Sequence, residues 1–425
     1  MNVLITPSKL KGQIRAIPSK SHAHRVLIAQ KLAQLQGNSS CSSLDIPTFS
    51  DDIGATKNCL VQLDKEKPYL DCRESGSTLR FMLPVAMAVK DEAVFIGAGK
   101  LPDRPISPLK EEMENHGCNF RMGNKAQKIS DKYREICTIT GKLTPGDYHL
   151  AGNVSSQFIT GLLFALPLLE EDSRLKLTTV LESAGYVDLT LDVLRSFSII
   201  INETVSDDGL ITYHIPGRQK YIEPDDLSIQ GDWSNAGFWL ACGALGGDIT
   251  VTGLDMDSSQ RDKEIVDILR RMGAEIIIDN TGVVACRGGA PGCMLKGAEV
   301  SVAQIPDIVP VLATVMSQAE GSSMITNAER LKIKESDRLK TVYDFLSRLG
   351  ADITYAGAGL SLTGRSTLKG GEVSSHNDHR IAMAAAVASC GCEEPVMICN
   401  AEAVRKSYPR FFEDFAALGG NVKEI

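Results

Sequence analysis

The chain has 425 residues, of which 43% are hydrophobic and 23% are charged, a composition typical of globular proteins and not of disordered or fibrous ones. At about 150 residues per domain, this length predicts two to three domains. There are 45 basic and 53 acidic residues, so the net charge is −8. Because non-specific nucleic-acid binding depends on positive surface, we expect no nucleic-acid partner.

The sequence also argues against a membrane protein and a metalloprotein. It contains no run of the roughly 18 apolar residues that a membrane-spanning helix needs, and its beginning lacks the pattern of a signal peptide. The eleven cysteines are scattered and odd in number, which favours buried, reduced thiols. We therefore expect a cytoplasmic protein without membrane contact and without a structural metal.

A weak repeat organises the chain. A helix-like stretch, a turn and an apolar strand recur at a spacing of roughly 75 residues in LKEEMENHGCNF (109–120), LDVLRSFSIII (191–201), VDILRRMGAEIII (266–278), VYDFLSRLGADI (342–353) and FFEDFAALGGNV (411–422). Between Ile265 and Met272, apolar residues follow the spacing of one buried helical face, and Gly273 suits the left-handed residue that ends a helix. With a first unit at 50–63, the repeat predicts an α/β protein of about six units, three in each of two domains.

Polar residues recur at the expected starts of helices. Ser, Thr, Asp or Asn precedes an apolar helical run in PSKSHAHR (18–25), ESGSTLR (74–80), GNVSSQF (152–158), GDWSNAG (231–237), KESDRLK (334–340) and HNDHRIA (376–382). Four of these segments carry an arginine near the first turn: Arg25, Arg80, Arg338 and Arg380. A cation there opposes the helix dipole by about 0.3–1 kcal/mol, so the pattern favours an anionic ligand at these helix starts. The alternative is ordinary capping with solvated arginines.

Two further segments add cations to this set. LPDRP (101–105) places Arg104 in a rigid turn, and VRKSYPRFF (404–412) places Lys406 before a helix that we expect to start at Ser407 to Pro409. Each of them alone is weak evidence, because charged segments are usually solvated. Together with the arginines at the helix starts, they predict a shared site for an anion.

Carboxylates indicate what such a site does. Asp307 lies in an apolar context between Pro306 and Pro310, and Glu335 follows Lys334. A carboxylate repels an anionic ligand, but it can accept the proton of a hydroxyl group, so Asp307 favours a reaction over simple binding. The alternative is that Asp307 caps the helix that follows it.

Seven motifs resemble those of the EPSP synthases, the shikimate-pathway members of the enolpyruvyl transferase family. They are PSKSHAHR (18–25), LPDRP (101–105), SSQF (155–158), IPD (305–307), IKESDRL (333–339), NDHR (377–380) and RKSYP (405–409). The motifs stand in the order of the family and span essentially the whole chain. IKESDRL together with NDHR is highly specific for the family.

The resemblance implies two similar domains, each of three βαβαββ-type units, with helix N-termini facing a cleft between the domains. Residues 1–16 and 229–425 would form one domain, with the phosphoenolpyruvate side and the general base, and residues 17–228 the other, on the shikimate 3-phosphate side. The implied reaction transfers the enolpyruvyl group of phosphoenolpyruvate to the 5-hydroxyl of shikimate 3-phosphate through a tetrahedral intermediate and releases phosphate. The resemblance implies a monomer with small-molecule substrates and without a metal or cofactor.

The resemblance also implies residue roles. Asp307 would take the proton of the hydroxyl group, and Glu335 with Lys20 or Lys406 would manage protonation of the methylene carbon; His379 is the fifth implied catalytic residue. The residues implied for shikimate 3-phosphate are Ser21, Arg25, Ser155, Ser156, Gln157, Ser183 and Tyr186, with Lys334 at the shikimate end. Those implied for phosphoenolpyruvate are Lys20, Gly76, Arg104, Arg338, Arg380 and Lys406. The two substrates carry two carboxylates and two phosphates, which accounts for the number of cations.

Some positions depart from the family pattern. Glu74 stands where the family commonly has Asn, and Arg330, which we count among the substrate-binding residues, stands where several relatives have Asn. We hypothesise that Gly76 leaves room for the inhibitor glyphosate. One alternative function is that of the sister enzyme, UDP-N-acetylglucosamine enolpyruvyl transferase, whose Lys-Asn pair is replaced here by Lys20 and Ser21. The other is a non-catalytic protein that binds phosphorylated metabolites, which the two carboxylates disfavour.

Overall fold

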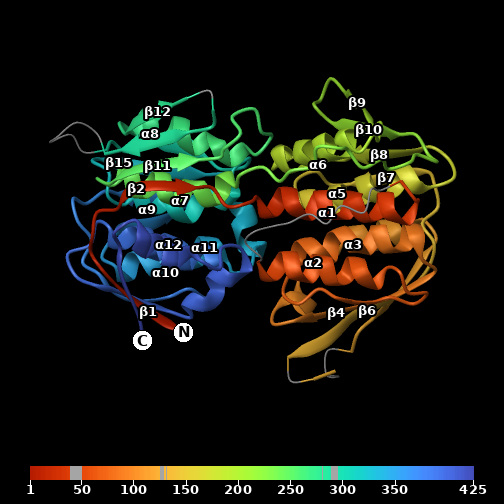
Figure 1. Cartoon of the computed structure of the whole chain (residues 1–425), viewed down its shortest axis with the longest axis horizontal. Helices are drawn as coiled ribbons and strands as arrows, with labels where there is room; N and C mark the ends of the chain where they lie inside the picture. The colour runs from red at the N-terminus through yellow and green to blue at the C-terminus, as the bar shows by residue number, and fades with distance from the viewer. Residues whose placement is uncertain (39–49, 125–128, 131, 280, 289–294) are drawn as a thin grey trace. The chain divides into compact units, whose positions relative to one another are not determined.

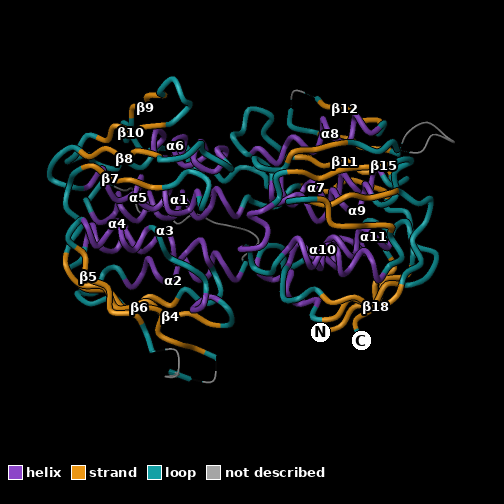
Figure 2. The backbone as a smooth tube through the Cα atoms, turned by 180° about the vertical axis from the view of Figure 1, so that it is seen from behind, coloured by secondary structure: helices purple, strands orange, loops and turns teal. Residues whose placement is uncertain are grey.

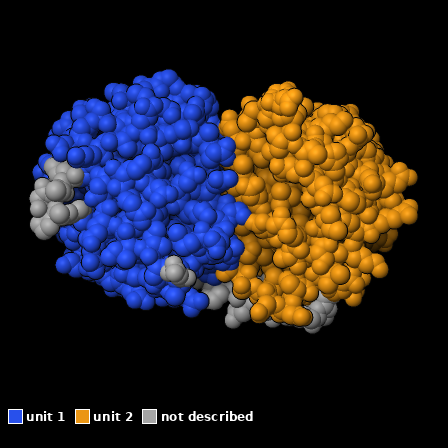
Figure 3. Space-filling view, turned by 90° about the horizontal axis from the view of Figure 1, so that it is seen from above, with its two compact units in different colours: residues 1–19, 230–425 blue, residues 20–229 orange. Residues whose placement is uncertain are grey.

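The computed structural model describes residues 1–38, 50–124, 129–130, 132–279, 281–288 and 295–425. The chain divides into two compact units (Figure 3). Unit 1 comprises Met1–Ser19 and Gln230–Ile425, and unit 2 comprises Lys20–Ile229. The chain therefore passes between the units twice, after Ser19 and after Ile229.

The sheets of both units repeat one topology. Within the described residues there are five four-stranded sheets, and in each of them a parallel pair of strands is extended by two antiparallel strands. In unit 1 the sheets have the orders β2 (Lys11–Arg15), β11 (Asp248–Thr252), β13 (Val284–Arg287), β12 (Glu275–Ile278); β14 (Glu299–Ser301), β15 (Ser322–Thr326), β17 (Gly359–Thr363), β16 (Asp352–Ala356); and β18 (Gly371–Ser374), β19 (Val396–Cys399), β1 (Asn2–Thr6), β20 (Asn421–Glu424). In unit 2 they are β3 (Tyr69–Asp71), β4 (Glu92–Ala98), β6 (Tyr133–Gly141), β5 (Cys118–Met122); and β7 (Asp147–Leu150), β8 (Ser173–Leu177), β10 (Ile211–Ile215), β9 (Asn202–Val205).

Helices lie on the inner side of the sheets in each unit, as the two opposite views show (Figures 1 and 2). Unit 1 contains α7 (Trp233–Ala244), α8 (Ile265–Met272), α9 (Val309–Met316), α10 (Arg338–Arg348), α11 (His379–Ser389) and α12 (Phe411–Ala417). Unit 2 contains α1 (Lys20–Leu35), α2 (Asp51–Gln62), α3 (Gly76–Val89), α4 (Leu109–Asn115), α5 (Ser156–Ala165) and α6 (Ala184–Ser196). Short 3-10 helices are η1 (Leu101–Asp103), η2 (Leu166–Leu168), η3 (Arg261–Glu264), η4 (Pro306–Ile308), η5 (Glu329–Ile333) and η6 (Ala401–Lys406).

Three helices form the centre of unit 1. Every residue of α7, α9 and α11 is buried, and α9 and α11 pack against each other. Their sequences explain this position, because they are mostly apolar on all sides, and α7 and α11 are rich in alanine, which lets helices approach closely. Each unit has its own cluster of buried apolar residues, so each has its own core.

The mixed α/β class predicted from the sequence is confirmed. The repeat is confirmed in detail at Gly273, which ends α8 with φ +105° and is followed by β12. The six polar segments stand at the starts of α1, α3, α5, α7, α10 and α11, as the capping argument predicted.

One helix start was predicted wrongly. We expected a helix to start at Ser407 to Pro409, but η6 ends at Lys406 and α12 begins only at Phe411. Ser407 leaves the helical conformation, with φ −139° and ψ −37°, and Tyr408, which precedes Pro409, is disfavoured in that conformation, so the chain turns once before α12 can start. In the described part of the chain, we find no helix with the length and apolarity required to cross a lipid bilayer.

The aromatic side chains of α7 and α12 allow a direct test of the core of unit 1. Phe411 is fully buried, and its ring lies 4.9 Å from that of Trp239 in a stacked arrangement. Phe411→Ala should lower the free energy of unfolding by about 3–5 kcal/mol, because it leaves a cavity among aromatic rings. The two tryptophans of the sequence, Trp233 and Trp239, both belong to unit 1, so tryptophan fluorescence during urea denaturation follows this unit.

The neighbouring residue provides the control. Phe412 also contacts Phe411 but is only partly buried, so Phe412→Ala should cost clearly less. Equal losses for the two variants would show that the stack on Trp239 does not hold α12 against α7.

Candidate active site

Asp307 lies among three cations of unit 1. It belongs to η4, which stands directly before α9. Its Oδ1 accepts hydrogen bonds from Arg338 Nη1 at 2.7 Å and from Lys334 Nζ at 3.2 Å, and its Oδ2 lies 3.3 Å from Arg380 Nη2. The alternative that Asp307 caps α9 is wrong, because α9 begins after Ile308 without a side-chain cap.

Arg338, the first residue of α10, is bound by two carboxylates. Its Nε and Nη2 donate to the two oxygens of Asp378 at 2.8 and 3.2 Å, while Nη1 donates to Asp307. Burial disfavours the charge of Arg338, which is only 2% exposed, but Asp378, Asp307 and Glu335 raise its pKa above the ordinary value. The guanidinium is therefore permanently charged and fixed in direction.

Asp378 caps the helix that carries two of the predicted residues. The carboxylate accepts the backbone N–H of Arg380 at 3.0 Å and the hydroxyl of Ser336 at 2.9 Å, in addition to the guanidinium of Arg338. Burial acts to raise the pKa of Asp378, but Arg338 outweighs it, so the pKa lies below its usual value. From the sequence we expected an anionic ligand between an arginine and a helix start; between Arg338 and the start of α11, the carboxylate of Asp378 takes this place.

Glu335, His379 and Lys406 form a second polar group beside Arg338. Glu335 Oε2 lies 3.0 Å from His379 Nδ1 and 4.0 Å from Lys406 Nζ. Lys406 also donates to the backbone carbonyl of Asn377 at 2.7 Å. His379 is only 1% exposed, so its imidazole is held in place next to the carboxylate. A carboxylate between an imidazole and an ammonium group can take up and return a proton.

In unit 2, the starts of α1, α2 and α3 are tied together. Lys20, the first residue of α1, pairs with Asp52 of α2 at 2.8 Å. The backbone carbonyl of Asp52 accepts the hydroxyl of Thr78 of α3 at 3.4 Å, and Ser75 caps α3 by accepting the N–H of Thr78. The ammonium of Lys20 and the free N–H groups at the start of α3 are thus linked through α2.

Gly76 and Arg104 are in direct contact. A Cβ atom at Gly76 would clash with Nη1 of Arg104, so the absence of a side chain is what lets the guanidinium lie over the start of α3. Arg104 follows η1 directly and has an extended backbone. Glu74, the position at which the family commonly has Asn, lies against Gly99 in the same loop region.

Arg80, Gln157 and Ser77 form a chain of hydrogen bonds between α3 and α5. Arg80 Nη1 donates to Gln157 Oε1 at 2.8 Å, and Gln157 Nε2 donates to the hydroxyl of Ser77 at 2.8 Å. Arg80 also donates to the carbonyl of Pro105, beside Arg104. The network fixes the amide of Gln157, one of the residues implied for shikimate 3-phosphate.

Arg25 uses its guanidinium mainly for internal contacts. It is 2% exposed and donates to the carbonyls of Ser21 and Tyr186 at 2.6 and 2.8 Å and to the hydroxyls of Thr190 and Thr160 at 2.8 and 3.4 Å. These contacts take four of the five N–H groups of an arginine. Arg25 therefore holds two implied substrate contacts, Ser21 and Tyr186, in one place.

The remaining predicted residues lie next to these groups. Ser155 caps α5 by accepting the N–H of Gln157 at 3.3 Å, and Ser156 is the first residue of that helix. Ser183 precedes α6 with a left-handed φ of 55°. Arg330 belongs to η5 and is close enough to Lys334 for its charge to act on the ammonium.

Two titratable groups near Asp307 have displaced pKa values. Burial lowers the pKa of Lys334 to about 8, with Arg330 and Arg338 adding to the effect and Asp307 opposing it. Burial also raises the pKa of Asp262 to about 7, and the charge of Asp307 acts in the same direction. Asp262 accepts a hydrogen bond from the hydroxyl of Ser234. Perturbed pKa values of this kind cluster at active sites.

One group of possible metal ligands occurs in the described part of the chain. Glu335, Asp378 and His379 each offer a ligand atom, and these atoms lie within 4.8 Å of one another. The guanidinium of Arg338 already binds Asp378 and lies 3.9 Å from Glu335. A divalent cation placed there would face this positive charge, so the group is suited to binding the arginine.

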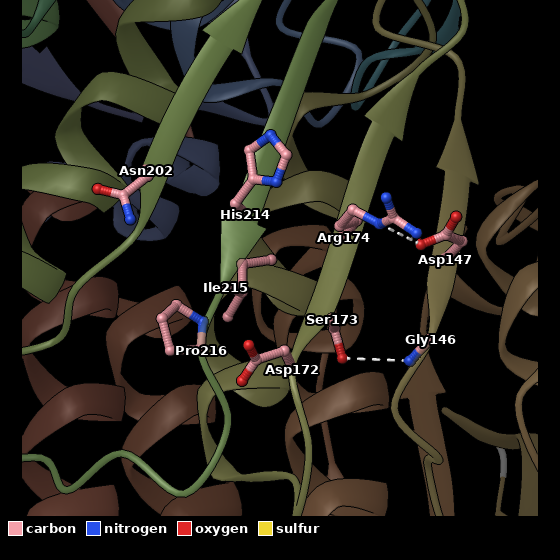
Figure 4. Close-up of a pocket in the computed structure, with 9 residues that line it drawn as sticks. All are labelled: Gly146, Asp147, Asp172, Ser173, Arg174, Asn202, His214, Ile215 and Pro216. Carbon is pink, nitrogen blue, oxygen red and sulfur yellow. Dashed lines mark hydrogen bonds and ion pairs between the residues drawn. The ribbon is translucent and has the colours of Figure 1, made fainter.

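A separate hollow lies elsewhere on unit 2. It has a volume of about 500 Å³ and is lined by strands β7, β8, β9 and β10 and their loops (Figure 4). Its lining residues include Arg174, which pairs with Asp147 at 2.7 Å, and His214. It contains none of the residues predicted for the site, so we do not assign the reaction to it.

Three residues that hold predicted site residues in place were not assigned a role from the sequence. These are Asp378, which binds Arg338; Asp52, which binds Lys20; and Arg80, which binds Gln157. Arg80 and Asp378 stood in the segments that we singled out as helix starts, but a partner in another helix leaves no signal in the local sequence.

Comparisons with known proteins agree with this architecture. The sequence profile of the family described as EPSP synthase (3-phosphoshikimate 1-carboxyvinyltransferase) matches residues 52–415. The chain belongs to the EPSP synthase family. The 3-phosphoshikimate 1-carboxyvinyltransferase of Clostridium novyi is 40% identical over 451 residues and is covered to 98%, with all of this chain aligned. That of Clostridium kluyveri is 43% identical over 444 residues, which cover 99% of this chain and 98% of the relative.

Two solved structures share the fold. EPSP synthase from Acinetobacter baumannii superposes with a TM-score of 0.76 at 22% identity, and each chain is covered completely. The enolpyruvyl transferase NikO from Streptomyces tendae gives a TM-score of 0.71 at 16% identity over 99% of this chain and 98% of its own. The recurring sheet topology described above is therefore the architecture of a known family.

The unusual environment of Lys334 can be tested directly. When the free protein is labelled with a small amine-acylating reagent at increasing pH, Lys334 should titrate near pH 8, because burial lowers the pKa of its ammonium to about 8. Asp307→Asn should lower this value further, since the charge of Asp307 raises it. Mass spectrometry of the labelled peptide gives the titration, and a midpoint near the ordinary lysine value of about 10.4 would contradict the burial of the ammonium.

Proposed function

We propose that the protein transfers the enolpyruvyl group of phosphoenolpyruvate to the 5-hydroxyl of shikimate 3-phosphate and releases phosphate, a step in the biosynthesis of chorismate and the aromatic amino acids. Membership of the EPSP synthase family supports this reaction. The observation that carries the proposal is Asp307, a carboxylate surrounded by Arg338, Lys334 and Arg380. A carboxylate in that place repels an anion that is only bound, whereas a reaction that removes a hydroxyl proton needs a base, which a carboxylate supplies.

The proposed reaction is an addition followed by an elimination. Asp307 accepts the proton of the 5-hydroxyl, and the oxygen attacks the carbon of phosphoenolpyruvate that carries the phosphate ester. The group of Glu335, His379 and Lys406, with Lys20, supplies the proton that converts the methylene carbon into a methyl group. In the second step a methyl proton returns to this group, and the phosphate leaves with the proton that Asp307 had accepted, which restores the double bond and the carboxylate of Asp307. The distance of 3.0 Å between Glu335 and His379 suits such a two-way transfer, and Lys406, at 4.0 Å from Glu335, takes part once it moves closer.

We assign shikimate 3-phosphate chiefly to unit 2. The residues are Ser21, Arg25, Ser155, Ser156, Gln157, Ser183 and Tyr186, with Lys334 and Arg330 of unit 1 as further contacts. Since four N–H groups of Arg25 are already bonded, its main contribution is to position Ser21 and Tyr186. The start of α5, with Gln157 held by Arg80, is suited to a phosphate because helix N-termini present free N–H groups.

We assign phosphoenolpyruvate to Lys20, Gly76 and Arg104 of unit 2 and to Arg338, Arg380 and Lys406 of unit 1. The cations around Asp307 are shared with its carboxylate in the free protein, so a phosphate or carboxylate of the substrate competes for them. This competition releases Asp307 from its ion pairs when the substrate binds and strengthens it as a base. We further propose that the protein acts in the cytoplasm as a monomer.

The two alternative functions differ in what they predict. The sister enzyme would use UDP-N-acetylglucosamine in place of shikimate 3-phosphate, and a non-catalytic binding protein would release no phosphate from either pair of substrates. A coupled phosphate-release assay with phosphoenolpyruvate and each acceptor separates all three.

The role of Asp307 can be tested by replacement. Asp307→Asn should lower kcat by about 10²–10⁴-fold, the usual contribution of a general base. Shikimate 3-phosphate should still bind, because its main contacts are assigned to unit 2. Phosphate release gives the rate, and isothermal titration calorimetry gives the affinity.

A surface carboxylate of the same unit serves as the control. Asp267 of α8 pairs only at the surface, with Arg270 at 3.2 Å, and Asp267→Asn should leave turnover unchanged. Near-normal turnover of Asp307→Asn would remove Asp307 from the mechanism.

The contact between Gly76 and Arg104 predicts the effect of one methyl group. Gly76→Ala should displace the Arg104 guanidinium, raise KM for phosphoenolpyruvate by roughly tenfold, and weaken inhibition by glyphosate. Steady-state kinetics with and without the inhibitor measure both effects. Gly237→Ala is the control, since a Cβ there would lie 3.8 Å or more from its neighbours. Unchanged KM and unchanged inhibition in Gly76→Ala would refute the assignment of Arg104.

A further inference from the structure

The two segments by which the chain leaves and re-enters unit 1 are bonded to each other. The backbone N–H of Ser19 donates to the carbonyl of Gln230 at 2.8 Å, and the N–H of Asp232 donates to the carbonyl of Ile17 at 2.9 Å. Ser19 is the last residue before the chain passes to unit 2, and Gln230 is the first residue after it returns. The two crossing segments, residues 17–19 and 230–233, therefore form a short antiparallel pair at the border of unit 1.

A single buried amide binds both crossing segments. Gln260 stands directly before η3 and is 7% exposed. Its Oε1 accepts the hydroxyl of Ser19 at 3.0 Å and the backbone N–H of Trp233 at 3.2 Å. Its Nε2 donates to the carbonyl of Gly231 at 3.0 Å. One side chain thus joins the outgoing segment, the returning segment and the first residue of α7.

Ser258 completes this arrangement. Its hydroxyl oxygen lies 3.2 Å from the backbone nitrogen of Gln260 and 3.1 Å from Nε2, both of which can donate to it, and its hydroxyl donates to Gln230 Oε1 at 2.7 Å. Both ends of the Gln260 amide are therefore used. A glutamine is required here, because glutamate lacks the N–H donors and an apolar side chain of the same length lacks donors and acceptors alike.

The residue that follows Ser19 is Lys20, which the proposed function places at phosphoenolpyruvate. Lys20 begins α1, and the hydroxyl and N–H of Ser19 are both bonded within unit 1. On the returning side, α7 begins at Trp233 and carries Ser234, whose hydroxyl binds Asp262, two residues after Gln260. The contacts of Gln260 therefore fix the backbone on which Lys20 is presented.

We propose that Gln260 is a positioning residue, which pairs the two crossing segments through Ser19, Gly231 and Trp233 and thereby fixes Lys20 for the reaction. The kinetic part of this inference rests on the proposed function, whereas the pairing of the segments does not. Gln260 touches no substrate in this scheme and acts through Lys20.

The kinetic test uses Gln260→Met, which keeps the length of the side chain and removes its polar atoms. KM for phosphoenolpyruvate should rise and kcat should fall, together by roughly ten- to a hundredfold, because a small misplacement of a positioned group has effects of this size. The affinity for shikimate 3-phosphate alone should change less than about twofold. A general loss of structure would weaken the binding of both substrates and would not affect phosphoenolpyruvate alone.

Two further variants protect the test against a general loss of stability. Gln318→Met removes another buried glutamine of unit 1, which donates to the carbonyl of Thr314 at 3.3 Å. This variant should leave KM for phosphoenolpyruvate and the affinity for shikimate 3-phosphate unchanged. Ser19→Ala removes only one hydroxyl group and should reproduce part of the effect of Gln260→Met. In the double variant, the Ser19→Ala change should add little, since its partner atom is already absent.

Amide hydrogen exchange tests the pairing independently of activity. In Gln260→Met and Ser19→Ala, the N–H groups of Ser19 and Asp232 should exchange faster, while the core of α7 and α11 keeps its protection. Normal exchange of these two amides together with normal kinetics would overturn the proposal. Faster exchange would overturn the positioning of Lys20 if KM for phosphoenolpyruvate and the dissociation constant of shikimate 3-phosphate changed by the same factor. If the wild-type chain released no phosphate at all, the proposed function would fail, and the exchange data would still decide whether Gln260 pairs the segments.

Discussion

The organisation of unit 1 depends on one buried guanidinium. Arg338 is bound by Asp378 through two hydrogen bonds and by Asp307 through a third, so α10, α11 and η4 are held around a single charge. Removing one partner of such a buried ion pair costs about 3–5 kcal/mol, because a charge is then left uncompensated. The same bonds aim Arg338, Asp307 and the start of α11 at one place. Stability of the unit and geometry of the site are therefore consequences of one interaction.

Unit 2 achieves a similar arrangement with a different charge balance. Arg25 and Arg80 are buried as Arg338 is, but the bonds described here go to carbonyl, amide and hydroxyl oxygens and not to carboxylates. Neutral acceptors fix a guanidinium in direction and leave its positive charge uncancelled. Unit 2 is therefore suited to attract a doubly charged phosphate ester, whereas unit 1 combines cations with the carboxylates that proton transfer needs. The family's reaction requires both kinds of environment.

The two chain crossings add a third element to this division. The residues that we propose to bind substrate and to transfer protons lie on both sides of Ser19 and Ile229, so the backbone at these points connects the two proposed sets. The buried amide of Gln260 is placed where it can stiffen both crossings at once. A polar residue in such a position specifies a geometry that an apolar core residue could not, because hydrogen bonds have direction and apolar contacts do not.

The sequence by itself determined the local features. Helical periodicity gave the repeat, the polar segments gave the helix starts, and Gly273 marked the left-handed end of α8, since each of these depends on residues close together in the chain. The family motifs also located Asp307, Glu335 and the cations. Only the tertiary structure decided which partners those groups have: that Asp378 binds Arg338, that Arg25 donates to two backbone carbonyls, and that Gln260 meets Ser19 across 241 positions of sequence. These pairings join segments that lie far apart in the chain. They depend on burial and on the direction of hydrogen bonds, which leave no periodic or local pattern in the sequence.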